Sequence, residues 1–295
     1  MAAMRFITAA LLLILSGTLF SGRVMAQEPS SPTSVPFKNG VEVKINGHGP
    51  YQFGIDTGAS TGFTITPELS RELSLPVTSH TQSHSAMEHA NDPSVDVVHI
   101  DDLLLAGHLF HHAIGIAPPN ASPLVKNGSG LLGIGLFQDV VVRLDYPSNK
   151  LSISEQSLPP EDGKNILKYN DVHLRPYVDI LLGGVPANAC IDTGAKDSGA
   201  DVTVPPDFAS RLHLQNLVKL PYGWTDINRR NHEMSRATLD GDLTIGSIVV
   251  HNPTLLITDS VPFVNLGSVL NKLVITLDAR NHRVKLEMPG KTQPE

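Results

Sequence analysis

One pentapeptide, Ile-Asp-Thr-Gly-Ala, occurs twice in this chain of 295 residues, at 55–59 and at 191–195. The two aspartates, Asp56 and Asp192, are 136 residues apart, and Gly47 and Gly183 repeat at the same offset. This period is far longer than the unit of a solenoid repeat. The duplication therefore predicts two similar lobes, each of which brings one aspartate loop toward the other.

The local patterns of both halves favour β structure. The chain is 41% hydrophobic and 17% charged, which is typical of a globular protein, and it has 24 glycines and 22 prolines but few long helical patterns. Residues 41–45 alternate between apolar and polar, and Asn46-Gly47 predicts a turn into a strand that ends at Ile55. Short helices are predicted at 67–75 and 206–214, each beginning at a proline. The sequence thus predicts a mainly β protein.

The first 26 residues predict a secretory signal peptide. Arg5 precedes an apolar run from Phe6 to Phe20, and a small residue, Ala26, ends the segment. An uncleaved anchor is the alternative, although this run is short for a membrane span. After cleavage we expect a periplasmic or secreted protein with no stable membrane insertion. The other boundaries that we expect are a flexible leader at 27–36, an N-terminal lobe at 37–156, a linker at 157–170 and a C-terminal lobe at 171–290.

Charge and cysteine content narrow the class of protein further. Loss of the signal peptide removes two arginines and leaves 20 basic against 29 acidic residues, a net charge of −9. Such a chain offers no basic stripe for phosphates, so we expect no nucleic-acid partner. The single cysteine, Cys190, lies in an apolar segment directly before the second pentapeptide. It is interpreted as a small buried hydrophobe, because apolar flanks would raise the pKa of a nucleophilic thiol.

Two aspartate loops that face each other can hydrolyse a peptide bond. Like charges about 3 Å apart cannot both ionise, so the pair shares one proton. The ionised carboxylate takes a proton from water while the protonated one polarises the substrate carbonyl. A threonine hydroxyl after each aspartate can donate across to the opposite loop. The glycine after each threonine lets a backbone N–H approach the carboxylate without a side chain in the way.

These motifs carry a family resemblance. Asp-Thr-Gly-Ala in both halves, followed by an apolar-apolar-Gly element such as Leu131-Leu132-Gly133 and a short helix, resembles the retropepsin-like aspartic proteases, in particular exported bacterial ones. The resemblance covers most of residues 38–288. It implies two retropepsin-like β-barrel lobes, fused in one chain with the active-site cleft between them. It also implies the site residues, which are catalytic Asp56 and Asp192 with Thr57, Gly58, Ala59, Thr193, Gly194 and Ala195 as support.

Two features depart from the family's pattern. Family members close over the substrate with a flap, but the corresponding region of the first half, about 79–96, contains no glycine and is rich in histidine. In the second half, Pro221-Tyr222-Gly223-Trp224 is a candidate hairpin tip, where Tyr222 and Trp224 would cover a peptide or else pack in the core. An insertion after the second pentapeptide begins with Lys196. Its ammonium either lies close to the dyad, where it would lower the apparent pKa of the carboxylates, or points into solvent.

Other chemistries find little support in the sequence. Seven of the 13 histidines fall between His80 and His112, but their spacing matches no frame of metal ligands, and a solvated loop beside an edge strand is the preferred interpretation. Arg236 stands where a zinc-protease helix beginning at His232 would need its second histidine. We therefore expect neither a metal nor an organic cofactor.

The sequence thus favours an exported aspartic endopeptidase that binds a peptide or protein substrate as an extended strand. The alternative is a catalytically silent module that binds peptides or envelope components through the same cleft, which the altered first flap favours. A fused monomer with pseudo-twofold lobes is expected, and pairing of each lobe with its twin in another chain is the other arrangement.

Overall fold

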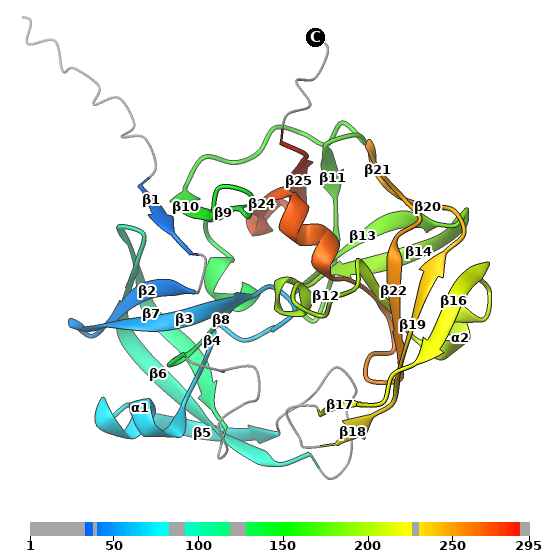
Figure 1. Ribbon diagram of the computed structural model, residues 1–295. Coiled ribbons are helices and arrows are strands. Elements are labelled where there is room, and N and C mark those ends of the chain that lie inside the picture. Colours follow the sequence, from blue (N-terminus) through cyan, green and yellow to red (C-terminus); the bar gives the residue numbers. More distant parts are fainter. Residues whose placement is uncertain (1–32, 38–39, 83–91, 119–127, 226–229, 290–295) are drawn as a thin grey trace, which may run out of the picture. The chain divides into compact units, whose positions relative to one another are not determined.

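The computed structural model describes residues 33–37, 40–82, 92–118, 128–225 and 230–289, and it is mainly β (Figure 1). The predicted signal peptide and most of the predicted leader lie outside these residues. Within them, no helix has the length and apolar character that a membrane span requires. The residues from Pro32 onward belong to one compact unit, so the boundaries predicted between the lobes and the linker stay predictions.

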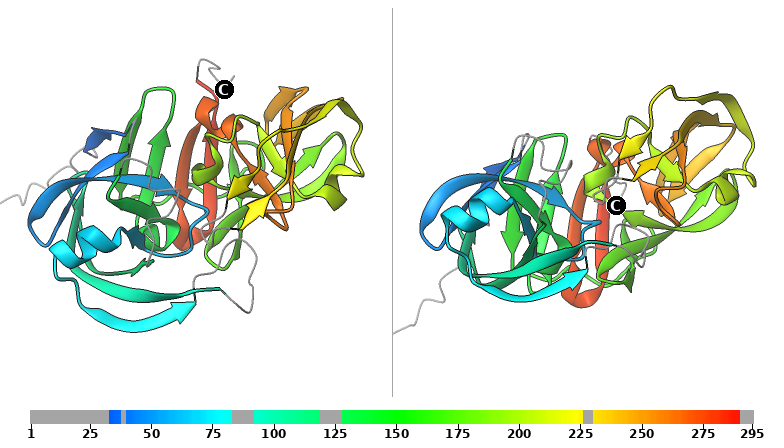
Figure 2. Two further views of the ribbon diagram at one scale, coloured as in Figure 1. Left: turned by 60° about the horizontal axis from the view of Figure 1, so that its bottom comes forward. Right: turned by 90° about the horizontal axis from the view of Figure 1, so that it is seen from below.

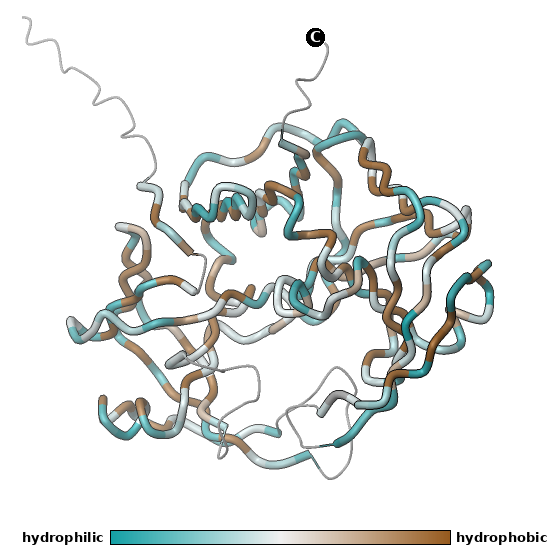
Figure 3. The backbone as a smooth tube through the Cα atoms, viewed as in Figure 1, coloured by the Kyte–Doolittle hydropathy of each residue, from teal (hydrophilic) through white to brown (hydrophobic). Residues whose placement is uncertain are grey.

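The first half forms a barrel. Val41, Val43 and Ile45 of β2 are buried while the residues between them are exposed, as the alternation predicts, and Figure 3 shows such changes in hydropathy along many strands. Seven strands form one sheet, and an additional β2–β6 pairing closes it. In spatial order the strands are β2 (Val41–Ile45), β3 (His48–Asp56), β8 (Gly130–Gly133), β4 (Phe63–Ile65), β7 (His108–Ala117), β6 (Ser94–Leu105) and β5 (Val77–Gln82).

The second half repeats this topology with shorter strands. Where the first half has the continuous strands β6 and β7, the second has β19 with β20 and β21 with β22, and Asp240-Gly241 interrupts the first of these pairs. The sheet contains β16 (Leu214–Lys219), β19 (Met234–Leu239), β22 (Thr254–Thr258), β15 (Val202–Val204), β23 (Val264–Leu266), β14 (Val185–Ile191), β13 (Arg175–Leu182), β20 (Asp242–Ile245) and β21 (Ile248–His251), with β12 (Asn170–Val172) paired to β13. The short strands β17 (Trp224–Thr225) and β18 (Asn231–His232) pair with each other.

A six-stranded sheet joins the two halves and stands between them in Figure 2. At its centre β9 pairs antiparallel with β24, so that Leu144 faces Ile275 and Val142 faces Leu277. All four side chains are buried. The strands, in spatial order, are β1 (Ser34–Pro36), β10 (Lys150–Ser154), β9 (Val141–Asp145), β24 (Val274–Asp278), β25 (Arg283–Glu287) and β11 (Ile166–Lys168).

The ends of this sheet revise two expectations from the sequence. β1 belongs to the predicted leader and β11 to the predicted linker, yet β1 pairs with β10 and β11 pairs with β25. Both segments read as loops because of their proline, serine and glycine content. Each nevertheless forms hydrogen bonds with the strand beside it, β10 or β25, whose backbone N–H and C=O groups would otherwise be exposed at an open sheet edge.

Helices are few and short among the described residues. Thr66 caps α1 (Pro67–Glu72) by accepting from the Leu69 N–H at 3.3 Å. The helix α2 spans only Pro206–Ala209, so the prediction of a helix to residue 214 was too long. Leu214 instead begins β16 and pairs with Leu239, because sheet pairing outweighs local helix propensity there. The 3₁₀ turns are η2 (Ile134–Phe137), η3 (Thr193–Ala195), η4 (Ser268–Lys272) and η5 (Ala279–Asn281).

Candidate active site

Corresponding strands of the two halves deliver the two aspartates. Asp56 is the last residue of β3, and Asp192 directly follows β14. Each of these strands lies parallel to the apolar-Gly strand of its own half, β8 for β3 and β23 for β14. Each apolar-Gly element thus lies beside the strand that carries the aspartate of its own half.

The threonines of the two pentapeptides lock the loops to each other. The Thr193 hydroxyl accepts from the Thr57 N–H at 3.0 Å and donates to the Ile55 carbonyl at 2.9 Å. The Thr57 hydroxyl makes the reciprocal contacts, with the Thr193 N–H at 3.1 Å and the Ile191 carbonyl at 2.5 Å. Both threonines are fully buried. The predicted cross-loop hydrogen bonds are thus confirmed, and they fix the position of one aspartate relative to the other.

The glycines allow the two loops to approach closely. A Cβ added at Gly58 would lie 2.5 Å from Cγ of Asp192, and one added at Gly194 would lie 2.7 Å from Cγ of Asp56. The Gly58 N–H donates to Oδ1 of Asp56 at 2.9 Å, and the Gly194 N–H donates to Oδ1 of Asp192 at 2.8 Å. Each carboxyl therefore lies against the backbone of both loops, which places the predicted dyad in one small volume.

The environment of Asp56 favours its protonated form. Burial raises the pKa of Asp56 well above its usual value, and the neighbouring Asp192 raises it further; the N–H groups of Gly58 and Ala59 counteract only part of this rise. The predicted lowering of the dyad's pKa by Lys196 is wrong for this carboxyl. The Lys196 ammonium pairs instead with Asp197 at 2.6 Å.

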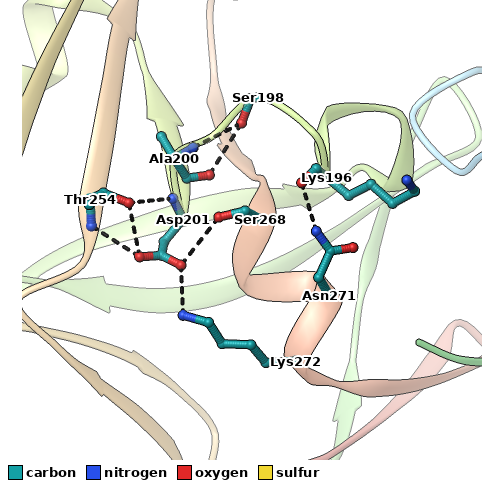
Figure 4. Close-up of polar contacts among 8 residues, drawn as sticks. All are labelled: Lys196, Ser198, Ala200, Asp201, Thr254, Ser268, Asn271 and Lys272. Atoms are coloured by element: carbon teal, nitrogen blue, oxygen red, sulfur yellow. Dashed lines mark hydrogen bonds and ion pairs between the residues drawn. The ribbon is translucent and has the colours of Figure 1, made fainter. Parts of the chain in front are cut away.

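A buried carboxylate, Asp201, anchors the insertion that follows the second pentapeptide. It accepts from the Thr254 backbone and hydroxyl and from the Lys272 ammonium at 3.0 Å (Figure 4). Burial acts to raise the pKa of Asp201, but these donors outweigh it and the pKa is lowered. Asn271 holds the same insertion by donating to the Lys196 carbonyl at 2.9 Å. The loop that carries Asp192 is thus tied to β22 and η4.

The dyad and its loops are also contacted by three residues that were not predicted from the sequence. Arg175 of the second half donates from Nε to the Gly58 carbonyl of the first at 2.8 Å. Tyr146 lies in the turn between β9 and β10, and its buried phenol interacts electrostatically with both aspartates. Asn265 donates to Asp192 at 2.6 Å. Only Asn265 left a signal in the sequence, as a polar residue in an apolar-Gly element.

Each half carries a hairpin in the region where a flap was expected. β5 pairs with β6 in the first half, and residues 83–91, which separate the two strands in the sequence, lie outside the described part. In the second half β16 pairs with β19, and β17 with β18 beyond them. Residues 221–223 therefore lie along one arm, and the predicted tip position was wrong because the strands continue past it. The two hairpins are linked by an ion pair between Arg230 and the buried Asp92 at 3.0 Å.

The predicted aromatic substrate contacts stay predictions. Tyr222 is 60% exposed, which is inconsistent with the alternative that it packs in the core. The side chain of Trp224 lies outside the described residues. Exposure of a tyrosine on a hairpin arm leaves it available to a ligand.

Two other groups of residues can be assigned from their surroundings. Cys190 is fully buried, and burial raises the pKa of its thiol well above the usual value, as expected for a packing residue.

Potential metal-ligand atoms of His99, Asp101 and His112 lie within 4.8 Å of one another. The two imidazole rings, however, stack at 5.5 Å with planes 17° apart. Ring planes so nearly parallel do not favour lone pairs that meet at one ion.

Replacing Gly58 with alanine is expected to reduce any hydrolytic activity by about 100-fold or more, because the new methyl group would displace the Asp192 carboxyl. The measurement is kcat/KM on a peptide substrate, together with circular dichroism to verify folding. Gly163→Ala is the control, since a Cβ there meets nothing within 4 Å, and the backbone strain that its φ of +68° adds falls outside the two active loops. Equal activity of the two variants would contradict the close approach of the loops.

Solved structures and one family model are similar to parts of this chain. Among solved structures, a retropepsin-like aspartic protease from Rickettsia conorii is 18% identical, with 41% of this chain and 86% of that chain covered and a TM-score of 0.31. The EIAV protease complexed with the inhibitor HBY-793 is 20% identical, with 32% and 85% covered and a TM-score of 0.28. Among curated proteins, none matches the sequence. A family model described as aspartyl protease matches residues 41–136 and 178–276, more than half of the chain with one match in each half. This chain therefore belongs to the aspartyl protease family, as a member with two retropepsin-like lobes.

Proposed function

We propose that this protein is an endopeptidase that hydrolyses peptide bonds with a water molecule activated between Asp56 and Asp192. The observation that carries the proposal is the reciprocal packing of the two loops, in which the glycine of each lies against the carboxyl of the other. Two carboxyls in one partly buried volume share a proton rather than ionise together. This is the state that acid–base hydrolysis needs.

The proposed reaction uses both carboxyls in each of its two steps. One carboxylate removes a proton from water, the water oxygen attacks the carbonyl carbon, and the other carboxyl gives its proton to the carbonyl oxygen. The tetrahedral diol then collapses. Its C–N bond breaks as the first carboxyl protonates the nitrogen and a hydroxyl proton returns to the second. Asp192 is partly exposed and Gly194 is exposed, so water can reach the dyad from the second loop.

The hairpins support a substrate that binds as an extended strand. The β5–β6 and β16–β19 hairpins come from opposite halves and are linked through Asp92 and Arg230. Every residue of β5 is exposed, and β16 is exposed except for its first residue, which is half-buried. Such strands can hydrogen-bond a peptide backbone and leave its side chains to set the specificity. The N-terminal segment supports export, so a protein or peptide in the periplasm or outside the cell is the proposed substrate class.

The test is cleavage of a diverse peptide mixture by the purified chain, from acidic to neutral pH, with products identified by mass spectrometry. Asp56→Asn and Asp192→Asn are run beside the wild type. Cleavage that is lost in both variants supports the fused dyad. Loss in only one means that the second carboxylate comes from elsewhere. A folded wild type that binds peptides without cleaving them would establish the binding module instead.

A further inference from the structure

The two apolar-Gly strands differ at one position next to the dyad. In the first half Gly54 pairs with Leu131, and in the second half Cys190 pairs with Asn265. These pairs occupy the same place in the register. Leu131 directly precedes Leu132-Gly133, and Asn265 directly precedes Leu266-Gly267. In otherwise similar lobes, the second half therefore has an amide at this position, and the first half has a hydrocarbon side chain that lies over Gly54.

The amide of Asn265 contacts Asp192 directly. Its Nδ2 donates to Oδ2 of Asp192 at 2.6 Å, and the residue is 3% exposed. The other oxygen of Asp192, Oδ1, already accepts from the N–H groups of Gly194 and Ala195 at 2.8 and 3.2 Å. Both oxygens of Asp192 thus face donors. Such donors stabilise a carboxylate more than a neutral carboxyl group, because hydrogen bonds to an ionised acceptor are the stronger ones.

Asp56 lacks the corresponding contact, since the side chain at the equivalent position, Leu131, has no donor. The other titratable groups that interact with Asp192 are Asp56, Tyr146, Tyr177 and Cys190. Burial raises the pKa of both phenols and of the thiol, so these three groups are neutral at acidic and neutral pH. The guanidinium of Arg175 donates to the Gly58 carbonyl. Asn265 is therefore the side-chain donor that distinguishes the two carboxyls.

We propose that Asn265 is a positioning residue that makes the dyad asymmetric, holding the negative charge on Asp192 and leaving the shared proton on Asp56. This inference rests on the proposed function and assigns the roles in it. Asp192 takes the proton from water, and Asp56 gives its proton to the carbonyl oxygen. The raised pKa of Asp56 agrees with this assignment.

The first test is Asn265→Leu, which copies the side chain of the other half. Loss of the donor destabilises the singly ionised dyad relative to the fully protonated one, so the acid limb of the kcat/KM profile should move up by about one pH unit. The basic limb should stay in place, since Asp192 is ionised on both sides of that transition. The double variant Leu131→Asn/Asn265→Leu transfers the donor to Asp56 and should return the acid limb toward its wild-type position.

Two outcomes would overturn the proposal. A uniform fall in rate with both limbs in place would show that Asn265 only packs. A downward shift of the acid limb would show that its carbonyl oxygen accepts a proton from Asp192, which reverses the polarity.

A second measurement needs no activity. In protein labelled with ¹³C at the aspartate carboxyls, the Asp192 signal, identified by its absence in Asp192→Asn, should titrate at lower pH than that of Asp56. The difference should shrink in Asn265→Leu. This result would stand even if the chain cleaved no peptide, so failure of the proposed function and failure of the asymmetry are separable. Titration of Asp56 before Asp192 in the wild type would refute the assignment.

Discussion

Replacing Asp56 with asparagine is expected to lower kcat/KM by about 10³-fold or more and to stabilise the folded protein at neutral pH. Activity falls because an amide cannot supply the proton that the reaction needs, and general acid–base groups are worth about 10²–10⁴-fold each. The change nearly preserves shape. The side-chain oxygen can still accept from the Gly58 N–H, as Oδ1 of Asp56 does at 2.9 Å.

The gain in stability follows from the raised pKa of Asp56, whose first cause is burial and whose second is Asp192. The folded state holds this proton more tightly than the unfolded chain, where the pKa of aspartate is about 3.9. The contribution of Asp56 to the free energy of unfolding is therefore highest below that value and is lost as the pH rises through the folded-state pKa. An amide does not ionise, so the variant avoids this loss.

Urea denaturation of wild type and variant at neutral pH and below about pH 3 tests this prediction. The variant should be the more stable protein at neutral pH, and the difference should disappear in acid. Asp179→Asn is the matched control. Asp179 is an exposed residue of β13 that accepts a hydrogen bond from Asn188, so the same substitution is made outside the dyad. A destabilised variant at neutral pH would show that the Asp56 carboxylate is stabilised, rather than disfavoured, by its surroundings.

The active loops could be predicted because their chemistry depends on consecutive residues. The order Asp-Thr-Gly fixes a carboxyl, a hydroxyl and a bare N–H within one turn, and the structure uses them as expected at Thr57 and Thr193. Their duplication then indicated which residues would meet. The strands of each half could be predicted for the same reason. In Val41–Ile45, for example, apolar residues alternate with polar ones because every second side chain is buried.

Contacts between segments that are distant in the chain were harder to predict from the sequence. Nothing near Arg175 indicates that it reaches the carbonyl of Gly58, 117 residues away. The pairing of β1 with β10 depends on backbone groups that any sequence carries, so a leader of loop-like composition can still form a strand. Asn265 was an exception. Its polar side chain stands out from the sequence when Leu131-Leu132-Gly133 and Asn265-Leu266-Gly267 are aligned position by position.

Replacing Thr193 with valine is expected to lower the free energy of unfolding by about 2–5 kcal/mol. The shape is nearly unchanged, but the hydroxyl that accepts from the Thr57 N–H and donates to the Ile55 carbonyl is lost. Both backbone groups would stay buried without this partner, and each unsatisfied buried group costs about 1–3 kcal/mol. Activity should fall as well, because these bonds fix one aspartate loop relative to the other.

Thr193→Ser is the control that separates the hydroxyl from the methyl group. It keeps both cross-loop hydrogen bonds and removes one buried methyl, at a cost of about 1 kcal/mol. Denaturation of the two variants beside the wild type should therefore place serine close to threonine and valine well below both. The same order is expected at Thr57, whose hydroxyl makes the reciprocal bonds to the Thr193 N–H and the Ile191 carbonyl. Because the two hydroxyls lock the same pair of loops, the double valine variant should lose less than the sum of the single losses. Valine variants as stable as their serine counterparts would mean that packing, and not the reciprocal hydrogen bonds, holds the two aspartate loops together.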